Sequence, residues 1–250
     1  MTIHYICHFL FLKELFDLTE VIKFMEIAGT IAFSVSGAVI ACSAGLDVFG
    51  VVFIGCITAF GGGIMRDIIL GINPPAFFLN YAMFFLSVIS AISVFIINYV
   101  NREKLQHLNS KIEFINNLFD AIGLAAFSVI GAEVGFEKGY SNNALLVVTM
   151  GMLTGIGGGI IRDIMINKTP YVFKKHVYAL ASICGSLLYY ALKECIGTSF
   201  ASAIAVSAVI VIRILAMKFR WSLPKVHDET LKPQTFRMKN TERNVQMHKN

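Results

Sequence analysis

The chain has 250 residues, of which 56% are hydrophobic and only 15% are charged, against about 25% charged in an average soluble domain. The charges are also unevenly placed: no Asp, Glu, Lys or Arg occurs between Val48 and Met65 or between Ala76 and Asn101. A soluble domain of this size cannot leave such stretches uncharged, and the apolar runs are too long and continuous for a transmembrane β-barrel. The composition therefore excludes a soluble enzyme and a disordered chain, and it indicates an all-α membrane protein.

Seven apolar windows have the length of about twenty residues that crosses roughly 30 Å of hydrocarbon. They predict seven transmembrane helices, near residues 24–44, 48–70, 80–99, 115–135, 143–162, 175–193 and 197–217.

The two ends of the chain lie outside these windows. The apolar stretch Tyr5–Leu12 is too short to span a membrane and lacks the features of a signal peptide. We therefore interpret residues 1–23 as an N-terminal extension, either an interfacial helix or the product of an upstream start codon. Residues 218–250 form a polar, basic tail that we expect to be largely disordered.

The positions of Lys and Arg predict the orientation. Sixteen of them fall on the side of the C-terminus and five on the other side. We expect the protein to lie in the inner membrane of the cell. By the positive-inside rule, the tail and the connection at residues 101–114 then face the cytoplasm, and the N-terminus lies outside. The net charge of +5 is thus mostly a topology signal, and no nucleic-acid partner is expected.

The sequence contains an internal duplication. The block Gly61–Asp67 recurs ninety-six residues later as Gly157–Asp163, and matching blocks upstream recur at an offset of ninety-four, so two residues are inserted between them. This predicts repeat 1 at residues 24–100, repeat 2 at residues 115–195, and a seventh helix at 197–217. Because each repeat has three spans, the two must lie upside down relative to each other, and such folds place a transport pathway at the repeat interface.

The repeated block centres on a glycine triplet. Small residues four apart give each predicted helix a face that allows close packing, while consecutive glycines weaken a helix by about 1 kcal/mol each relative to alanine. A kink there could turn backbone carbonyls toward a pathway. Two interpretations stay open: the triplets are hinges of a pathway, or they only permit tight packing. The triplet residues are Gly61, Gly62, Gly63, Gly157, Gly158 and Gly159.

An Arg–Asp pair follows each triplet. We expect Arg66 with Asp67, and Arg162 with Asp163, to be hydrogen-bonded pairs that brace the two pore mouths without contacting the permeant ion. A charge at the bilayer centre costs about 3 kcal/mol on insertion scales, which favours a functional reason for keeping these pairs.

Other polar side chains in the spans are candidates for lining the pathway. The acids Glu26 and Asp120 align at an offset of ninety-four. They would stand at opposite mouths of a cation path, or they serve helix N-termini. The hydroxyl candidates are Thr58, Thr154, Ser34 and Ser128.

These motifs resemble a known family. The duplicated Gly-Gly-Gly-x-x-Arg-Asp, the Gly-x-x-x-Phe-Ser-x-x-Gly-Ala block at Gly29–Ala38 and Gly123–Ala132, and the Asn-Pro-Pro after the first triplet look like the bacterial branch of the trimeric intracellular cation (TRIC) channels, over about residues 20–217. The resemblance implies a seven-helix protomer with inverted repeats, kinks at the glycine triplets, a homotrimer with one pore in each protomer, and conduction of K⁺ and, less selectively, Na⁺.

We therefore expect a monovalent cation channel that is permeable to K⁺. The alternative is a carrier for a small amino acid such as glycine, because some bacterial relatives are described as glycine transporters and a helix N-terminus could hold the carboxylate. An enzyme is not expected, since no histidine cluster or metal-ligand spacing appears. Neither a cofactor nor a metal site is expected: K⁺ or Na⁺ enters only as the permeant ion. The expected partners are membrane lipid, two further copies of the chain, and the transported ion or amino acid.

Overall fold

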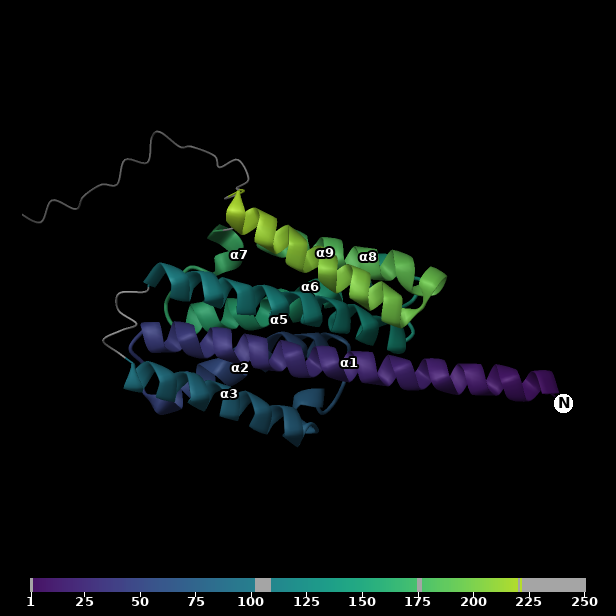
Figure 1. Ribbon diagram of the computed structural model, residues 1–250, viewed down its shortest axis with the longest axis horizontal. Helices are drawn as coiled ribbons and strands as arrows, with labels where there is room; N and C mark the ends of the chain where they lie inside the picture. Colours follow the sequence, from purple (N-terminus) through teal and green to yellow (C-terminus); the bar gives the residue numbers. More distant parts are fainter. Residues whose placement is uncertain (1, 102–108, 175–176, 220, 222–250) are drawn as a thin grey trace, which may run out of the picture.

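The structure, a computed structural model, describes residues 2–101, 109–174, 177–219 and 221, and this part of the chain contains helices and connections but no strand. The long helices run back and forth along one direction, so consecutive helices are antiparallel (Figure 1). In chain order the elements are α1 (Thr2–Ser43), α2 (Val48–Ile69), η1 (Ala76–Phe78), α3 (Tyr81–Val100), α5 (Asn109–Glu137), α6 (Ala144–Met165), α7 (Tyr171–Lys174), α8 (Val177–Ile196) and α9 (Thr198–Lys218).

Seven of these helices are long and apolar enough to cross a membrane: α1 from Glu20 onward, α2, α3, α5 from Ile112 onward, α6, α8 and α9. Their bounds agree with the expected windows to within four residues. The outer surface is lined with large apolar side chains, such as Phe85 and Ile89 on α3 and Val211 on α9, each more than half exposed. A soluble monomer does not leave so much apolar surface uncovered. The predicted all-α, seven-span membrane fold is confirmed.

The N-terminal extension is continuous with the first membrane-spanning helix, and both interpretations of residues 1–23 stay predictions. The backbone stays helical from Thr2 to Ser43, and the first part of α1 extends beyond the bundle in Figure 1. No proline lies in this stretch, so nothing forces the helix to end before the membrane span begins. The predicted disorder of the tail concerns residues that, apart from Lys218, Phe219 and Trp221, lie outside the described part of the chain.

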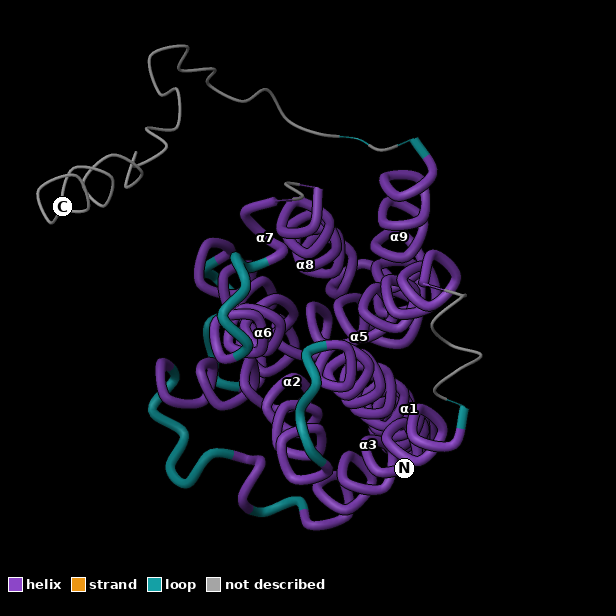
Figure 2. Tube along the Cα trace, turned by 90° about the vertical axis from the view of Figure 1, so that its left-hand side faces the viewer, coloured by secondary structure: helices purple, strands orange, loops and turns teal. Residues whose placement is uncertain are grey.

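The helices form two inverted groups. In the first, α3 packs on α1 and α2; in the second, α8 packs on α5 and α6. The groups meet where α1 contacts α5 and α2 contacts α6, as the view along the bundle shows (Figure 2). Helix α9 packs on α8 and α5 and has no counterpart in the first group. Two inverted three-helix repeats and a seventh helix are therefore the observed architecture.

Equivalent local signals mark the turns before α2 and α6 in the two repeats. Asp47 caps the start of α2 by accepting a hydrogen bond from the Gly50 amide, and Asn143 caps α6 in the same way. These caps are ninety-six residues apart, whereas Gly45 and Gly139, which both have positive φ in the preceding turns, are ninety-four apart. The two inserted residues therefore lie in the turn between α5 and α6, between Gly139 and Asn143.

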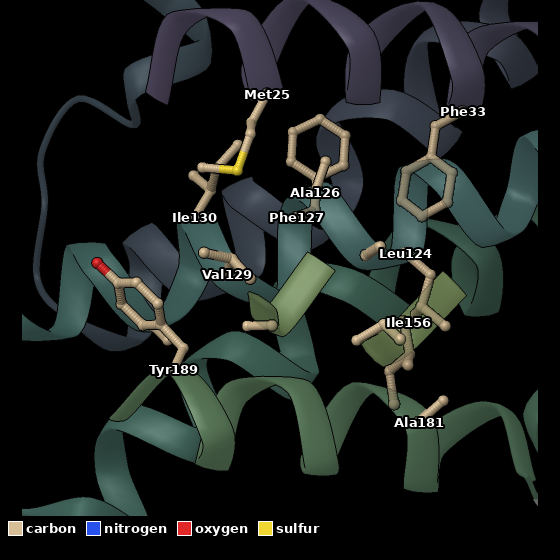
Figure 3. Close-up of a cluster of buried hydrophobic side chains, with 14 of the residues drawn as sticks. Met25, Phe33, Leu124, Ala126, Phe127, Val129, Ile130, Ile156, Ala181 and Tyr189 are labelled. Atoms are coloured by element: carbon tan, nitrogen blue, oxygen red, sulfur yellow. The ribbon is translucent and has the colours of Figure 1, made fainter. Parts of the chain in front are cut away.

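The core between the repeats is built from reciprocal contacts. Gly29 packs against the ring of Phe127, and its repeat equivalent Gly123 packs against the ring of Phe33. The two rings lie 5.4 Å apart between centroids. Figure 3 shows them in the buried cluster that joins α1 and α5. Because each glycine accepts the other repeat's phenylalanine, this contact fixes how far the two groups slide past each other.

Candidate functional site

The glycine triplets lie where α2 crosses α6. A β-carbon placed on Gly62 would fall on the carbonyl oxygen of Thr154, and one placed on Gly158 would fall on that of Thr58. The helices thus touch backbone to backbone at this crossing, and both stay α-helical through the triplets. At Gly62 and Gly158 the small face is occupied by helix packing. The hinge role expected for the triplets stays a prediction.

The hydroxyl candidates also have partners inside the bundle. Thr58 and Thr154 each donate to the carbonyl four residues earlier, at 2.7 and 2.6 Å. Ser34 Oγ donates to the Ser87 carbonyl at 2.7 Å, which joins α1 to α3. Ser128 Oγ lies 2.6 Å from Ser182 Oγ, which joins α5 to α8. The two serines thus join neighbouring helices, whereas the two threonines bond within their own helix. The role of all four hydroxyls in lining a pathway stays a prediction.

Each Arg–Asp pair closes the C-terminal end of its helix. Arg66 Nε donates to Asp67 Oδ1 at 2.8 Å, and Arg162 Nε donates to Asp163 Oδ1 at 2.9 Å. The second oxygen of each carboxylate accepts a backbone amide from the next short helix: Ala76 in η1 and Tyr171 in α7, both at 2.8 Å. Each aspartate therefore ties a long helix to the segment that follows it.

These pairs are buried at opposite ends of the bundle. Arg66 and Arg162 are 7% and 2% exposed, and because α2 and α6 are antiparallel their C-terminal ends point to opposite sides (Figure 1). Arg66 lies about 11 Å along the axis from the middle of α2, at 1.5 Å per residue, inside the half-thickness of about 15 Å of the hydrocarbon. Charges at this depth need partners within the protein.

The surroundings of the two pairs differ. Arg162 Nη1 also lies 3.3 Å from Asp120 Oδ1 of α5 and 3.3 Å from Ser36 Oγ of α1, so one side chain connects three helices. Within 4 Å, Arg66 forms an ion pair only with Asp67 among the described residues. The acid equivalent to Asp120 is Glu26, which accepts a hydrogen bond from Asn80 Nδ2 at 3.2 Å.

A cavity of about 190 Å³, lined by both polar and apolar side chains, opens at the second pair. It lies between α1, α5, α6 and the start of α7, and its lining carries both signs of charge. Such a cavity can hold hydrated cations or a small zwitterion. Its polar lining includes Asn116, Asn117, Asp120, Arg162, Asp163 and Lys168.

Two buried charges were missed by the sequence reasoning. Arg213 of α9 is 1% exposed, and its Nη2 lies 3.8 Å from Asp120 Oδ2. Glu133 of α5 is 3% exposed and accepts from Lys193 Nζ of α8 at 2.5 Å and from the Tyr189 hydroxyl. The signal was available, because an ionisable residue inside an apolar span is by default a candidate for function.

The described residues contain no group of three or more His, Cys, Asp or Glu side chains placed to hold a metal ion. The charged groups at the two ends are instead arranged as ion pairs and hydrogen-bonded carboxylates. Such an arrangement can shape the electrostatic potential along the bundle.

Comparison with known proteins gives a consistent set of matches. The family model described as glycine transporter matches residues 23–99 and again residues 117–194. The UPF0126 membrane protein YvgT of Bacillus subtilis (strain 168) is 35% identical over 202 residues, which are 81% of this chain and 95% of that protein.

Solved structures share the fold. A prokaryotic TRIC channel crystallised in 0.5 M KCl superposes with a TM-score of 0.74 at 33% identity, covering 82% of this chain and all of that one. The TRIC trimeric intracellular cation channel orthologue from Rhodobacter sphaeroides has a TM-score of 0.71 at 25% identity, covering 80% of this chain and 99% of that one. The family resemblance inferred from the motifs is confirmed.

Proposed function

The chain belongs to the family described as glycine transporter, and we propose that it works as a monovalent cation channel, permeable to K⁺, with one pathway through each protomer. The observation that carries this proposal is the structural match of 82% of this chain to the whole of a prokaryotic TRIC channel at 33% identity. Two inverted repeats with buried polar groups at both ends of their interface support it, because inverted-repeat folds place their pathway there.

The geometry also supports a route beside the helix crossing. At Gly62 and Gly158 the backbones of α2 and α6 are in contact, so an ion cannot pass between them there. The cavity at Arg162, bordered by α1 and α5, supports an entrance to the pathway at that end. The path would continue along the polar groups of α1 and α5.

A carrier for a small amino acid is the second candidate. The description of the family model favours it, and so does the cavity, in which Arg162 could hold a carboxylate and Asp120 an ammonium group. Proteoliposomes separate the two functions. A channel predicts K⁺ efflux that follows the membrane potential and is indifferent to glycine, whereas a carrier predicts saturable uptake of labelled glycine and K⁺ efflux no faster than from empty vesicles.

We propose a homotrimer in the inner membrane. The support is the relative described as a trimeric channel and the apolar outer surface of the protomer. Cross-linking in native membranes should give a ladder that ends at the trimer. A ladder that ends at the dimer would contradict this assembly.

We also propose that the C-terminus is cytoplasmic. The sixteen-to-five distribution of basic residues supports this orientation, and the seven spans place the two termini on opposite sides. A reporter fused after Asn250 should be active only in the cytoplasm. Activity of an extracytoplasmic reporter at the same position would reverse the orientation.

A further inference from the structure

Helix α9 brings a cation to one end of the bundle only. Its Arg213 is 1% exposed, lies 4.7 Å from the ring centroid of Tyr178 and forms a 3.8 Å ion pair with Asp120. Because α9 has no counterpart in repeat 1, no residue equivalent to Arg213 lies at the other end in the part of the chain that the structure describes. The extra helix thus breaks the symmetry of the two repeats at an acid that borders the cavity.

At this end the charges balance. Asp120 is shared by Arg162, at 3.3 Å, and Arg213, at 3.8 Å, and Arg162 also pairs with Asp163 at 2.9 Å. Two guanidinium groups therefore face two carboxylates, and the cluster has no net charge. We call these four residues the α9 cluster.

At the opposite end the charges do not balance. Arg66 and Asp67 neutralise each other. Glu26, the repeat equivalent of Asp120, accepts a hydrogen bond from neutral Asn80, and none of the ion pairs within 4 Å in the described part of the chain includes it. Among these three residues, which are the repeat equivalents of Asp120, Arg162 and Asp163, an ionised Glu26 leaves one net negative charge.

We propose that Arg213 sets the polarity of the pathway: it neutralises Asp120, so that cations meet an acidic mouth at Glu26 and a neutral mouth at Asp120. This inference rests on the proposed channel function. An acidic mouth concentrates cations, whereas a neutral one does not. Conduction should therefore be asymmetric, with the larger current when cations enter from the Glu26 side.

Arg213 contacts its neighbours through an ion pair with Asp120 and over the rings of Tyr171 and Tyr178. Its Nε and Nη2 donate to no acceptor among the described residues, and its distance to Asp120 is too long for a hydrogen bond. Replacing both members of a buried ion pair by apolar side chains of similar volume is often neutral or stabilising, so stability alone does not account for this pair. An ionisable side chain inside a membrane span is by default a candidate for a functional role, and Arg213 is such a side chain.

Single-channel recording of the full-length protein tests the inference. The variants are Arg213→Gln, which leaves the α9 cluster with one net negative charge, and Asp120→Asn with Arg213→Gln, which restores balance. Lys218→Gln is the matched control, because it removes the same charge from the exposed end of the same helix.

In symmetric KCl at about 10 mM, where the Debye length is about 30 Å, Arg213→Gln should raise the current carried by cations entering at the Asp120 mouth. A unit charge acting through water over 4–8 Å predicts an increase of about two- to fivefold. Rectification should then decrease. The gain should vanish in about 1 M KCl, where the Debye length is about 3 Å. The double variant should behave as wild type, and Lys218→Gln, which removes a charge from the solvent-exposed helix end, should give a smaller gain than Arg213→Gln.

Three results would overturn the inference while leaving the channel function intact: wild-type currents that do not rectify, unchanged currents in Arg213→Gln, or a double variant that retains the increase. If Arg213→Gln does not assemble, Asp120→Asn carries the test, because the α9 cluster then has one net positive charge and current through that mouth must fall below wild type. Wild-type protein without unitary K⁺ currents would instead contradict the proposed function, and this inference with it.

Discussion

Gly62 of α2 and Gly158 of α6 occupy the two sides of one helix crossing, each against the backbone carbonyl of the other repeat's threonine. The relation is reciprocal because the two residues are equivalent positions of an inverted repeat. A crossing this close leaves no room for a side chain at either position. The crossing lies between the two polar ends of the bundle.

A methyl group at the crossing should therefore destabilise the protein. Gly62→Ala or Gly158→Ala places a β-carbon on a backbone carbonyl, and we expect a loss of about 1–3 kcal/mol, the usual cost of overpacking. Thermal unfolding in detergent and the yield of assembled protein measure the effect. Leucine at either site is expected to prevent assembly. If this face lined a pathway instead, the leucine variants would still assemble but would not conduct.

Gly63→Ala is the matched control for this prediction. A β-carbon at Gly63 would meet only the Arg66 guanidinium, at 3.8 Å, and alanine is favoured over glycine in a helix by up to about 1 kcal/mol. We expect this variant to be at least as stable as wild type. Equal stability of Gly62→Ala and Gly63→Ala would show that the α2 and α6 backbones lie farther apart at the crossing than in this structure.

The two Arg–Asp pairs should respond unequally to the same substitution. Asp67→Asn leaves Arg66 buried without an ion-pair partner within 4 Å, and breaking a buried pair in this way costs about 3–5 kcal/mol. Asp163→Asn leaves Arg162 with Asp120, so its loss should be clearly smaller. Melting temperatures of the two variants, compared under one condition, test this order. A larger loss for Asp163→Asn would mean that Asp120 does not support Arg162.

The Glu133–Lys193 pair should show strong coupling. Lys193→Met leaves the Glu133 carboxylate, with a side chain 4% exposed, buried without its cation, at a cost of about 3–5 kcal/mol. Glu133→Val introduces the residue found at the equivalent position in repeat 1, Val39. The double variant should recover most of the stability, because no buried charge remains. Losses that simply add in a double-mutant cycle would exclude the coupling.

The helices and their inverted pairing follow from local patterns in the sequence. Apolar length predicts each span, and the repeated Gly61–Asp67 block identifies equivalent positions. Hydrogen bonds within one motif can also be predicted from the sequence, because Arg66 and Asp67 are neighbours in the chain. The change in repeat offset from ninety-four to ninety-six reflects two extra residues in the α5–α6 turn relative to the α1–α2 turn.

Contacts between segments that are distant in the sequence could not be predicted from local patterns. Arg213 counted only as a basic residue for topology, since nothing local tells which acid it faces across the bundle. The contact between Gly62 and the Thr154 carbonyl depends on the depth at which two helices cross, a quantity set by packing of whole repeats. For the same reason the sequence could not decide between a lining and a packing face for the glycines.

The most direct test of the proposed function is electrical recording of the purified protein in a planar bilayer with a KCl gradient. A K⁺-permeable channel should give discrete unitary currents that reverse close to the K⁺ equilibrium potential and do not change when glycine is added to either side. A silent bilayer, together with saturable glycine uptake by vesicles made from the same preparation, would contradict it.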